Sequence, residues 1–438
     1  RMRLARWLHD NKRLVAVEDA SGEEALVVLP GGKRVRPDVG RAVDLVASPK
    51  RDQVAVINHR YELVVVDLKN GRARILDRSR HDRIAGAAWS PDGAWIAYSL
   101  AENYHVSVLK LVEVRTGETH VVARPVLRDV APSFDPDGRF LYFLAFREFD
   151  PVYDKMAFDL GFPRGMRPYL VTLRKDLRSP FEQPPKPVDP KAKKEKFHVD
   201  LDGIEGRVVA FPVEEGIYDG ITGIPGAVLW TTWPVEGSLN QQWRSPEPPT
   251  KGTLEKFDLA KKKREPLTGG VSSFRVGGGR CAIRCGRRLR LVKAGEKPEE
   301  KGEAIGRESG WVDLARVRVL VEPRAEWGQM FREAWRLMRY HFWVPDMSGG
   351  DWEEGHDRYR PLLDRVASRS EFSDVLWEMQ GELGTSHCYE IGGDYRRAPR
   401  YDVGLLGADF AWAGKGWRIT RICRGDGWRD GAGSPLSA

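Results

Sequence analysis

The chain has 438 residues, of which 41% are apolar and 31% are charged, so length and composition predict two or three folded domains and exclude a largely disordered protein. No run of about 18 uncharged apolar residues occurs, so we expect no membrane-spanning helix and no membrane partner. The net charge of +8 is spread among acidic residues, and its densest run, residues 186–196, is proline-rich and predicts a solvated loop, so we expect no nucleic-acid partner.

Three short segments in the first third of the chain repeat a proline that is followed by an alternating apolar stretch. They contain Pro49, Pro91 and Pro136, which lie 42 and 45 residues apart. Repeats of roughly 40 to 50 residues, each with several short strands, are typical of propeller blades. Counting the less regular units that follow, we predict a β-propeller with about six blades over residues 1–318.

The turn residues of these units support the prediction. After Pro91, the Asp92-Gly93 pair favours a tight turn, because proline fixes φ and glycine accepts a positive φ. Strands are predicted on both sides of the turns at Asn70-Gly71 and Thr116-Gly117. Each unit is expected to bury its faces only against neighbouring blades.

The cysteines predict no metal site. Cys281 and Cys285 lie four residues apart and point to the same face if they are in a strand, whereas Cys388 and Cys423 are isolated. A zinc site would need a second close pair or two histidines at suitable spacing. We therefore expect buried thiols in a reducing compartment and no cofactor. No signal peptide is visible near Arg1, and we expect a cytoplasmic protein.

A small helical domain is predicted over residues 319–395. From residue 326, apolar residues recur at spacings of three and four, which predicts an amphipathic helix. Pro345 is expected to stop this helix, and His341 is expected to pack in its core.

Two further helices are predicted in this domain. The segment "WEEGHDRY" predicts the second, with Asp351 as its N-cap. Ser370 is a candidate cap for the third, and Gly384 fits the position just after that helix ends. Residues 396–438 return to short strands and turns.

A Ser-His pair, Ser386 and His387, follows the third helix directly in "GELGTSHCYE". The helix dipole places partial negative charge at a helix C-terminus, which favours the imidazolium that a general base must form. The hydroxyl of Ser386 is suited to orient His387 by a hydrogen bond. The pair by itself also fits a solvent-facing or core histidine.

The helical block, "FREAWRLMRYHFWVPDMSGGDWEEGHDRYRPLL" followed by "EFSDVLWEMQGELGTSHCYE", resembles the helical domain of the tricorn proteases, which are tail-specific (C-terminal processing) serine peptidases. The repeats before it resemble the family's second, seven-bladed propeller. "VGLLGADF" and the residues after it resemble the start of its PDZ domain. The resemblance implies a mainly β chain: about six of seven blades, a small helical domain, and a truncated PDZ-like domain over residues 396–438.

The resemblance also implies roles for the Ser-His pair. In the family the histidine is the general base and the adjacent serine links it to a glutamate, so these roles would fall on His387 and Ser386. The nucleophilic serine and the glutamate belong to an α/β domain that follows the PDZ domain. We therefore expect a fragment of a serine peptidase that acts on oligopeptides, inactive by itself, and a homo-oligomer as the full-length protein.

Two alternatives concern the missing nucleophile. Ser434 lies in a predicted turn, and no G-x-S-x-G sequence occurs, which argues against an enzyme like prolyl oligopeptidase. If the full gene lacked the α/β domain, the chain would be a non-catalytic propeller scaffold that binds a peptide or a protein partner.

Overall fold

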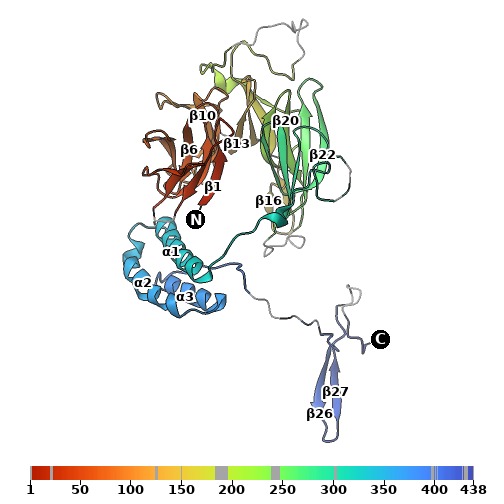
Figure 1. Cartoon of the computed structure of the whole chain (residues 1–438). Helices are drawn as coiled ribbons and strands as arrows, with labels where there is room; N and C mark the ends of the chain where they lie inside the picture. The colour runs from red at the N-terminus through yellow and green to blue at the C-terminus, as the bar shows by residue number, and fades with distance from the viewer. Residues whose placement is uncertain are drawn as a thin grey trace.

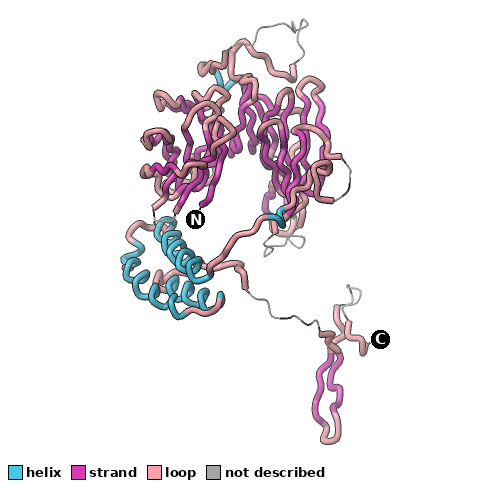
Figure 2. The backbone as a smooth tube through the Cα atoms, in the orientation of Figure 1, coloured by secondary structure: helices cyan, strands magenta, loops and turns pink. Residues whose placement is uncertain are grey.

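The computed structural model describes residues 2–19, 23–123, 127–148, 150–182, 196–237, 247–299, 302, 304–395, 399, 401, 403–426, 428 and 433–437. The basic run at residues 186–196, predicted to be a solvated loop, lies outside these residues except for Lys196. The sheets up to residue 293 form one body and the helices a second, smaller one, and the two-stranded sheet near the C-terminus lies apart from both (Figure 2).

The N-terminal sheets are antiparallel, and strands that are consecutive in the sequence are neighbours in each sheet. Blade 1 contains β1–β4 and blade 2 contains β5–β8. Their strands are β1 (Met2–Trp7), β2 (Leu14–Glu18), β3 (Ala25–Leu29), β4 (Lys33–Val35), β5 (Ala42–Ala47), β6 (Gln53–Asn58), β7 (Glu62–Asp67) and β8 (Ala73–Arg78).

Blades 3 and 4 are joined into one eight-stranded sheet by a single parallel pair, Ser107 with Arg128. All other pairs in this sheet are antiparallel. Blade 3 contains β9 (Ala85–Trp89), β10 (Trp95–Ala101), β11 (Ser107–Glu113) and β12 (Thr119–Val121). Blade 4 contains β13 (Arg128–Phe134), β14 (Phe140–Phe146), β17 (Arg167–Thr172) and β18 (Val208–Ala210), with the inserted hairpin β15 (Val152–Asp154) and β16 (Asp159–Gly161) and the 3-10 turn η1 (Ile204–Arg207).

Blades 5 and 6 complete the sheet region. Blade 5 contains β19 (Ile217–Ile224), β20 (Ala227–Trp233), β21 (Gly252–Asp258) and β22 (Lys263–Val271), and blade 6 contains β23 (Ser273–Gly277), β24 (Arg280–Cys285) and β25 (Arg288–Lys293). Trp311 adds an antiparallel bridge to Arg290 in β25. The described residues therefore contain the six blade-like units that the repeats predicted.

Each blade packs against the next through a separate apolar core, because central strands are apolar on both faces. In β6, Val54 and Val56 face the core shared with blade 1, whereas Ala55 and Ile57 face the core shared with blade 3. This alternation follows from the two-residue period of a strand. The same division continues through blades 3 to 6. The prediction that each unit buries its faces against neighbouring units is confirmed.

The first strands of successive blades contact one another, which places them at the centre of the arrangement in Figure 1. In blades 1 to 5 each of these strands has a register irregularity. In blades 3 and 5 the irregular residue is a glycine, Gly86 with φ 57° and Gly220 with φ 55°. Glycine fits these bulges because it tolerates the left-handed region, and the bulges bend the inner strands.

Three helices follow the sheets after the 3-10 turn η3 (Leu314–Arg316). They are α1 (Pro323–His341), α2 (Trp352–Tyr359) and α3 (Arg369–Gly381), with the 3-10 turns η4 (Met347–Gly349) and η5 (Arg360–Arg365) between them. Phe331, Trp352 and Phe372, one from each helix, meet in a common core. None of the helices in the described residues combines the length and the apolar character needed to cross a bilayer.

The caps of these helices confirm one prediction and correct another. Asp351 caps α2, accepting a hydrogen bond from the Glu354 amide at 2.9 Å. The cap of α3 is Ser368, which forms a capping box with Glu371, so the choice of Ser370 was wrong. The S-x-x-E spacing of Ser368 and Glu371 was the signal in the sequence that marks this cap.

Helix α1 docks on blades 1 and 2 through buried polar contacts. Arg41 forms an ion pair with Glu333 at 2.8 Å, and Arg336 bonds the same carboxylate from one turn further along α1. The ring of His341 is exposed and lies 6.0 Å from the ring of His59 in the loop after β6. The prediction that His341 packs in the helical core was therefore wrong, because the end of α1 faces the propeller.

The C-terminal residues form a two-stranded antiparallel sheet of β26 (Ala408–Trp412) and β27 (Trp417–Ile422). Every residue of β27 is exposed. Ser434 lies in a turn, as predicted, and its hydroxyl donates to the Leu406 carbonyl. This serine is engaged with the backbone of its own segment.

Candidate active site

His387 lies on a short loop after α3, and the packing of α3 sets where that loop begins. The helix ends at Gly381 with Glu382 as its C-cap, so the position just after the cap is Leu383, one residue before the predicted Gly384. Gly384 does adopt the left-handed conformation expected of a glycine after a helix, with φ 58°. The field of a helix dipole acts within the last turn, so six residues beyond Gly381 it gives His387 little support.

The loop is anchored to the helical core on both sides of the Ser-His pair. Leu383 is 8% exposed and belongs to that core, and the partly buried Cys388 packs against it. Ser386 and His387, between these anchors, are both exposed. The pair is therefore exposed to solvent on a loop that is anchored on both sides.

The backbone of His387 is in the left-handed region, with φ 68°. A residue with a Cβ atom pays about 1 kcal/mol or more for this conformation, and it persists where surrounding contacts hold it. The imidazole lies 6.0 Å from the ring of Tyr389 at an interplanar angle of 28°. No hydrogen bond joins Ser386 to His387 in the described part of the chain, so the expected orienting bond is not formed here.

The segment after His387 is tied to the first turn of α3 by Arg369. The guanidinium donates to Ser373 on the same helix and to Glu390 and Asp394 on the segment. Tyr395 bonds both Ser373 and Glu390. These residues were not predicted as a cluster, because nothing in their spacing along the sequence indicates that they meet.

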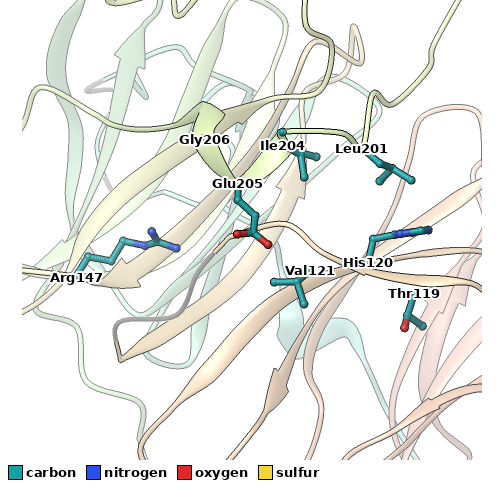
Figure 3. Close-up of a pocket in the computed structure, with 9 residues that line it drawn as sticks. Thr119, His120, Val121, Arg147, Leu201, Ile204, Glu205 and Gly206 are labelled. Carbon is teal, nitrogen blue, oxygen red and sulfur yellow. The ribbon is translucent and has the colours of Figure 1, made fainter.

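A cavity of about 850 Å³ lies on the propeller, on different elements from the His387 loop. Thr119, His120 and Val121 of β12 and the residues around η1 line it, and Arg147 and Glu205 turn toward the same space (Figure 3). The Arg147 guanidinium is paired with the buried Asp129 and lies over the rings of Phe143 and Tyr169. Arg147 is thus committed to structural contacts, and we assign the cavity no chemistry.

The cysteines are free thiols. Cys281 and Cys285 both contact the core between blades 5 and 6, which confirms that they share a face of β24. Only Cys281 is fully buried, so the expectation of four buried thiols was too broad. Burial raises the pKa of Cys281 to about 11, which keeps this thiol protonated and unreactive at neutral pH.

Three family models match consecutive parts of the chain. They are the tricorn protease second beta propeller domain over residues 1–295, the tricorn protease C1 domain over 323–381 and the tricorn protease PDZ domain over 404–438. The chain belongs to the tricorn protease family. His387 lies between the C1 and PDZ matches, six residues after the first ends.

Curated proteins similar to this tricorn-family chain are also named as tricorn protease homologues. Tricorn protease homolog 1 of Streptomyces coelicolor is 37% identical over 450 residues, covering 97% of this chain and 42% of that protein. The tricorn protease homolog of Saccharolobus solfataricus is 38% identical over 434 residues, covering 97% and 39%. The chain therefore spans less than half the length of these relatives.

A solved structure confirms the fold. A crystal structure of the tricorn protease superposes with a TM-score of 0.84 at 23% identity, covering 100% of this chain and 42% of that one. At this identity the match is informative about architecture: a propeller, a small helical domain and a PDZ-like segment in this order.

Proposed function

We propose that this tricorn-family chain supplies the general base, His387, of a serine-type endopeptidase that degrades oligopeptides. The observation that carries the proposal is the placement of His387, exposed on an anchored loop directly after the C1 domain. The nucleophilic serine and a glutamate that completes the catalytic set are proposed to lie outside residues 1–438.

In this mechanism His387 accepts the proton of the serine hydroxyl as the hydroxyl attacks the peptide carbonyl. The imidazolium then returns the proton to the leaving amine. The Ser386 hydroxyl accepts a hydrogen bond from the imidazolium and donates one to the glutamate, which fixes the ring and stabilises its charge. The exposure of both side chains leaves them free to meet those partners.

The other domains are given roles in the same proposal. The propeller over residues 1–318 admits unfolded peptides through its centre, the domain over 319–395 holds the base, and residues 396–438 form part of a PDZ-like domain. The working protein is proposed to be a cytoplasmic homo-oligomer. The free thiols support a reducing compartment.

The test is to replace His387 and Ser386 in the full-length gene product. His387→Ala is expected to lower kcat by about 10⁴-fold or more, because the hydroxyl is a poor nucleophile until a base takes its proton. Ser386→Ala, which leaves the base in place, is expected to cost less. Both variants should unfold at the wild-type temperature, since neither side chain is buried. Near-normal turnover by well-folded His387→Ala would refute the proposal.

The purified 438-residue chain provides a second test. Without the nucleophile it is expected to hydrolyse no peptides, although its fold is retained. Robust hydrolysis that a serine-directed reagent inhibits would show that the nucleophile has been misplaced. A full-length gene product that is also inactive and binds peptides would favour the scaffold alternative.

A further inference from the structure

The conformation of the His387 loop requires a cause, because the loop itself has few restraints. His387 holds a left-handed backbone angle of 68°, and residues 385–395 contain no helix or strand. Strained backbone of this kind persists only where neighbouring contacts determine it. Leu383 and Cys388 anchor the loop in the core, and the direction of the chain after Cys388 depends on the contacts of the residues that follow.

The contacts that fix this direction converge on Arg369. Its side chain is 10% exposed, and its carboxylate partner Glu390, three residues after His387, is 13% exposed. The guanidinium Nε also donates to Asp394 at 3.0 Å. One arginine in the first turn of α3 therefore holds two points of the segment that follows the base.

Tyr395 closes the cluster from the other side. Its ring centroid lies 4.8 Å from the guanidinium carbon, and its hydroxyl lies 2.5 Å from the Ser373 hydroxyl and 3.2 Å from a Glu390 oxygen. Phe372 contacts the same guanidinium, at 5.3 Å. A planar guanidinium with aromatic rings on its faces and acceptors at its edge has a defined orientation, which a lysine at the same position would not reproduce.

The cluster also keeps the Glu390 carboxylate ionised and paired with Arg369. Burial opposes ionisation, but hydrogen bonds from Ser373 and Arg369 lower the pKa of Glu390 below its usual value. The carboxylate is thereby committed to Arg369. If Arg369 were absent, Glu390 would keep its hydrogen bond from Tyr395 but would lose the cation paired with it, three residues from His387.

We propose that Arg369 is a positioning residue for His387: through Glu390 and Tyr395 it fixes the segment after the base and so sets the direction of the imidazole. The inference rests on the proposed role of His387 as general base. Arg369 touches neither substrate nor the reacting atoms, and it acts only through the loop.

The first test uses the 438-residue chain and does not depend on activity. The ring resonances of His387, observed by NMR, report on the order of the loop because the ring lies beside Tyr389. Arg369→Met is expected to move them toward random-coil positions. Arg339→Met is the matched control, since Arg339 also pairs with a carboxylate, Glu353, and contacts a ring, Trp335, in the same domain. That control should leave the His387 resonances unchanged.

The second test is kinetic and uses the full-length gene product. Arg369→Met is expected to lower kcat by about 100-fold per folded molecule, the usual cost of a misplaced catalytic group, and to change KM by less than about threefold. Arg369→Lys should restore part of kcat, because it keeps the charge opposite Glu390. A merely structural role predicts instead that activity falls only with the folded fraction.

Glu390→Gln keeps the inference testable if Arg369→Met does not fold. It removes the charge on the loop side, leaves α3 intact and should lower kcat in the same direction. Wild-type kcat and wild-type His387 resonances in a folded Arg369→Met or Glu390→Gln protein would overturn the inference. If His387→Ala is inactive while these variants are fully active, only the inference fails; if His387→Ala is itself active, the proposed function fails.

Discussion

Two regions of this molecule are held by arginine–glutamate pairs of similar burial, yet the pairs stabilise different things. At the interface between the propeller and α1, the side chains of Arg41 and Glu333 are 11% and 10% exposed. At the His387 loop, those of Arg369 and Glu390 are 10% and 13% exposed. The first pair joins two elements that have cores of their own, whereas the second joins a helix to a segment without regular structure.

The difference indicates what each pair contributes. Breaking the interface pair leaves buried charges between two rigid bodies, so it should lower the free energy of unfolding of the whole protein. Breaking the loop pair allows the segment to move into solvent, where the freed charges are hydrated. It should therefore reduce the order of the His387 loop and change the stability of the whole protein little. The predictions below test this contrast, from the largest expected effect on stability to the smallest.

Glu333→Gln should have the largest effect on stability. The change leaves both Arg41 and Arg336 without their shared carboxylate in a buried site. We expect the free energy of unfolding, measured with urea, to fall by about 3 kcal/mol. Glu353→Gln is the matched control, because it breaks an ion pair with Arg339 in which both side chains are exposed, Arg339 to 49% and Glu353 to 62%. This change should cost less than about 1 kcal/mol. Equal losses in the two variants would contradict the contrast.

His59 gives the interface a pH dependence. Burial, together with the charges of Arg60 and His341, lowers the pKa of His59 from 6.5 to about 4. Between these values the unfolded chain binds a proton that the folded chain does not. Stability from this group is therefore complete above pH 6.5 and is lost as the pH falls toward 4.

The measurement compares urea unfolding at pH 7 and pH 4.5 in wild type and His59→Asn. Asparagine retains an acceptor for the Arg41 amide, which donates to the His59 ring at 2.9 Å, but does not titrate. Wild type should lose about 2 kcal/mol more than the variant over this range. The same pH dependence in both proteins would show that His59 is protonated without cost in the interface.

Ser368→Ala should have the smallest effect. The Ser368 hydroxyl accepts a hydrogen bond from the Glu371 amide at the start of α3, and removing such a cap costs about 1 kcal/mol. Ser370→Ala, which removes only a contact of 3.1 Å to the Ser368 hydroxyl, should cost less. Thermal unfolding of both variants decides between the two candidate caps, and a larger loss in Ser370→Ala would reverse the assignment.

Much of the fold could be predicted from the sequence, because strand and turn signals are local. The turns at Asn70-Gly71 and Thr116-Gly117 lie between the strands expected, and the second helix has the bounds of "WEEGHDRY". The Ser368-to-Glu371 capping box was also readable, and it was missed in favour of Ser370. The position of the Ser-His pair after a helix was predicted, although the end of that helix was placed one residue too late, and the exposure of the pair was left open.

The pairing of distant charges was decided only by the tertiary structure. The chain has 71 basic and 63 acidic residues, so its sequence permits thousands of ion pairs and marks none of them. Arg41 meets Glu333 across 292 positions because α1 docks on the propeller, and Arg369 meets Glu390 because the chain turns back after Gly384. The residue types in the His387 region were set by the sequence. Packing decided which of them hold the loop, since a charge has no preferred partner until a fold brings one within reach and removes the water between them.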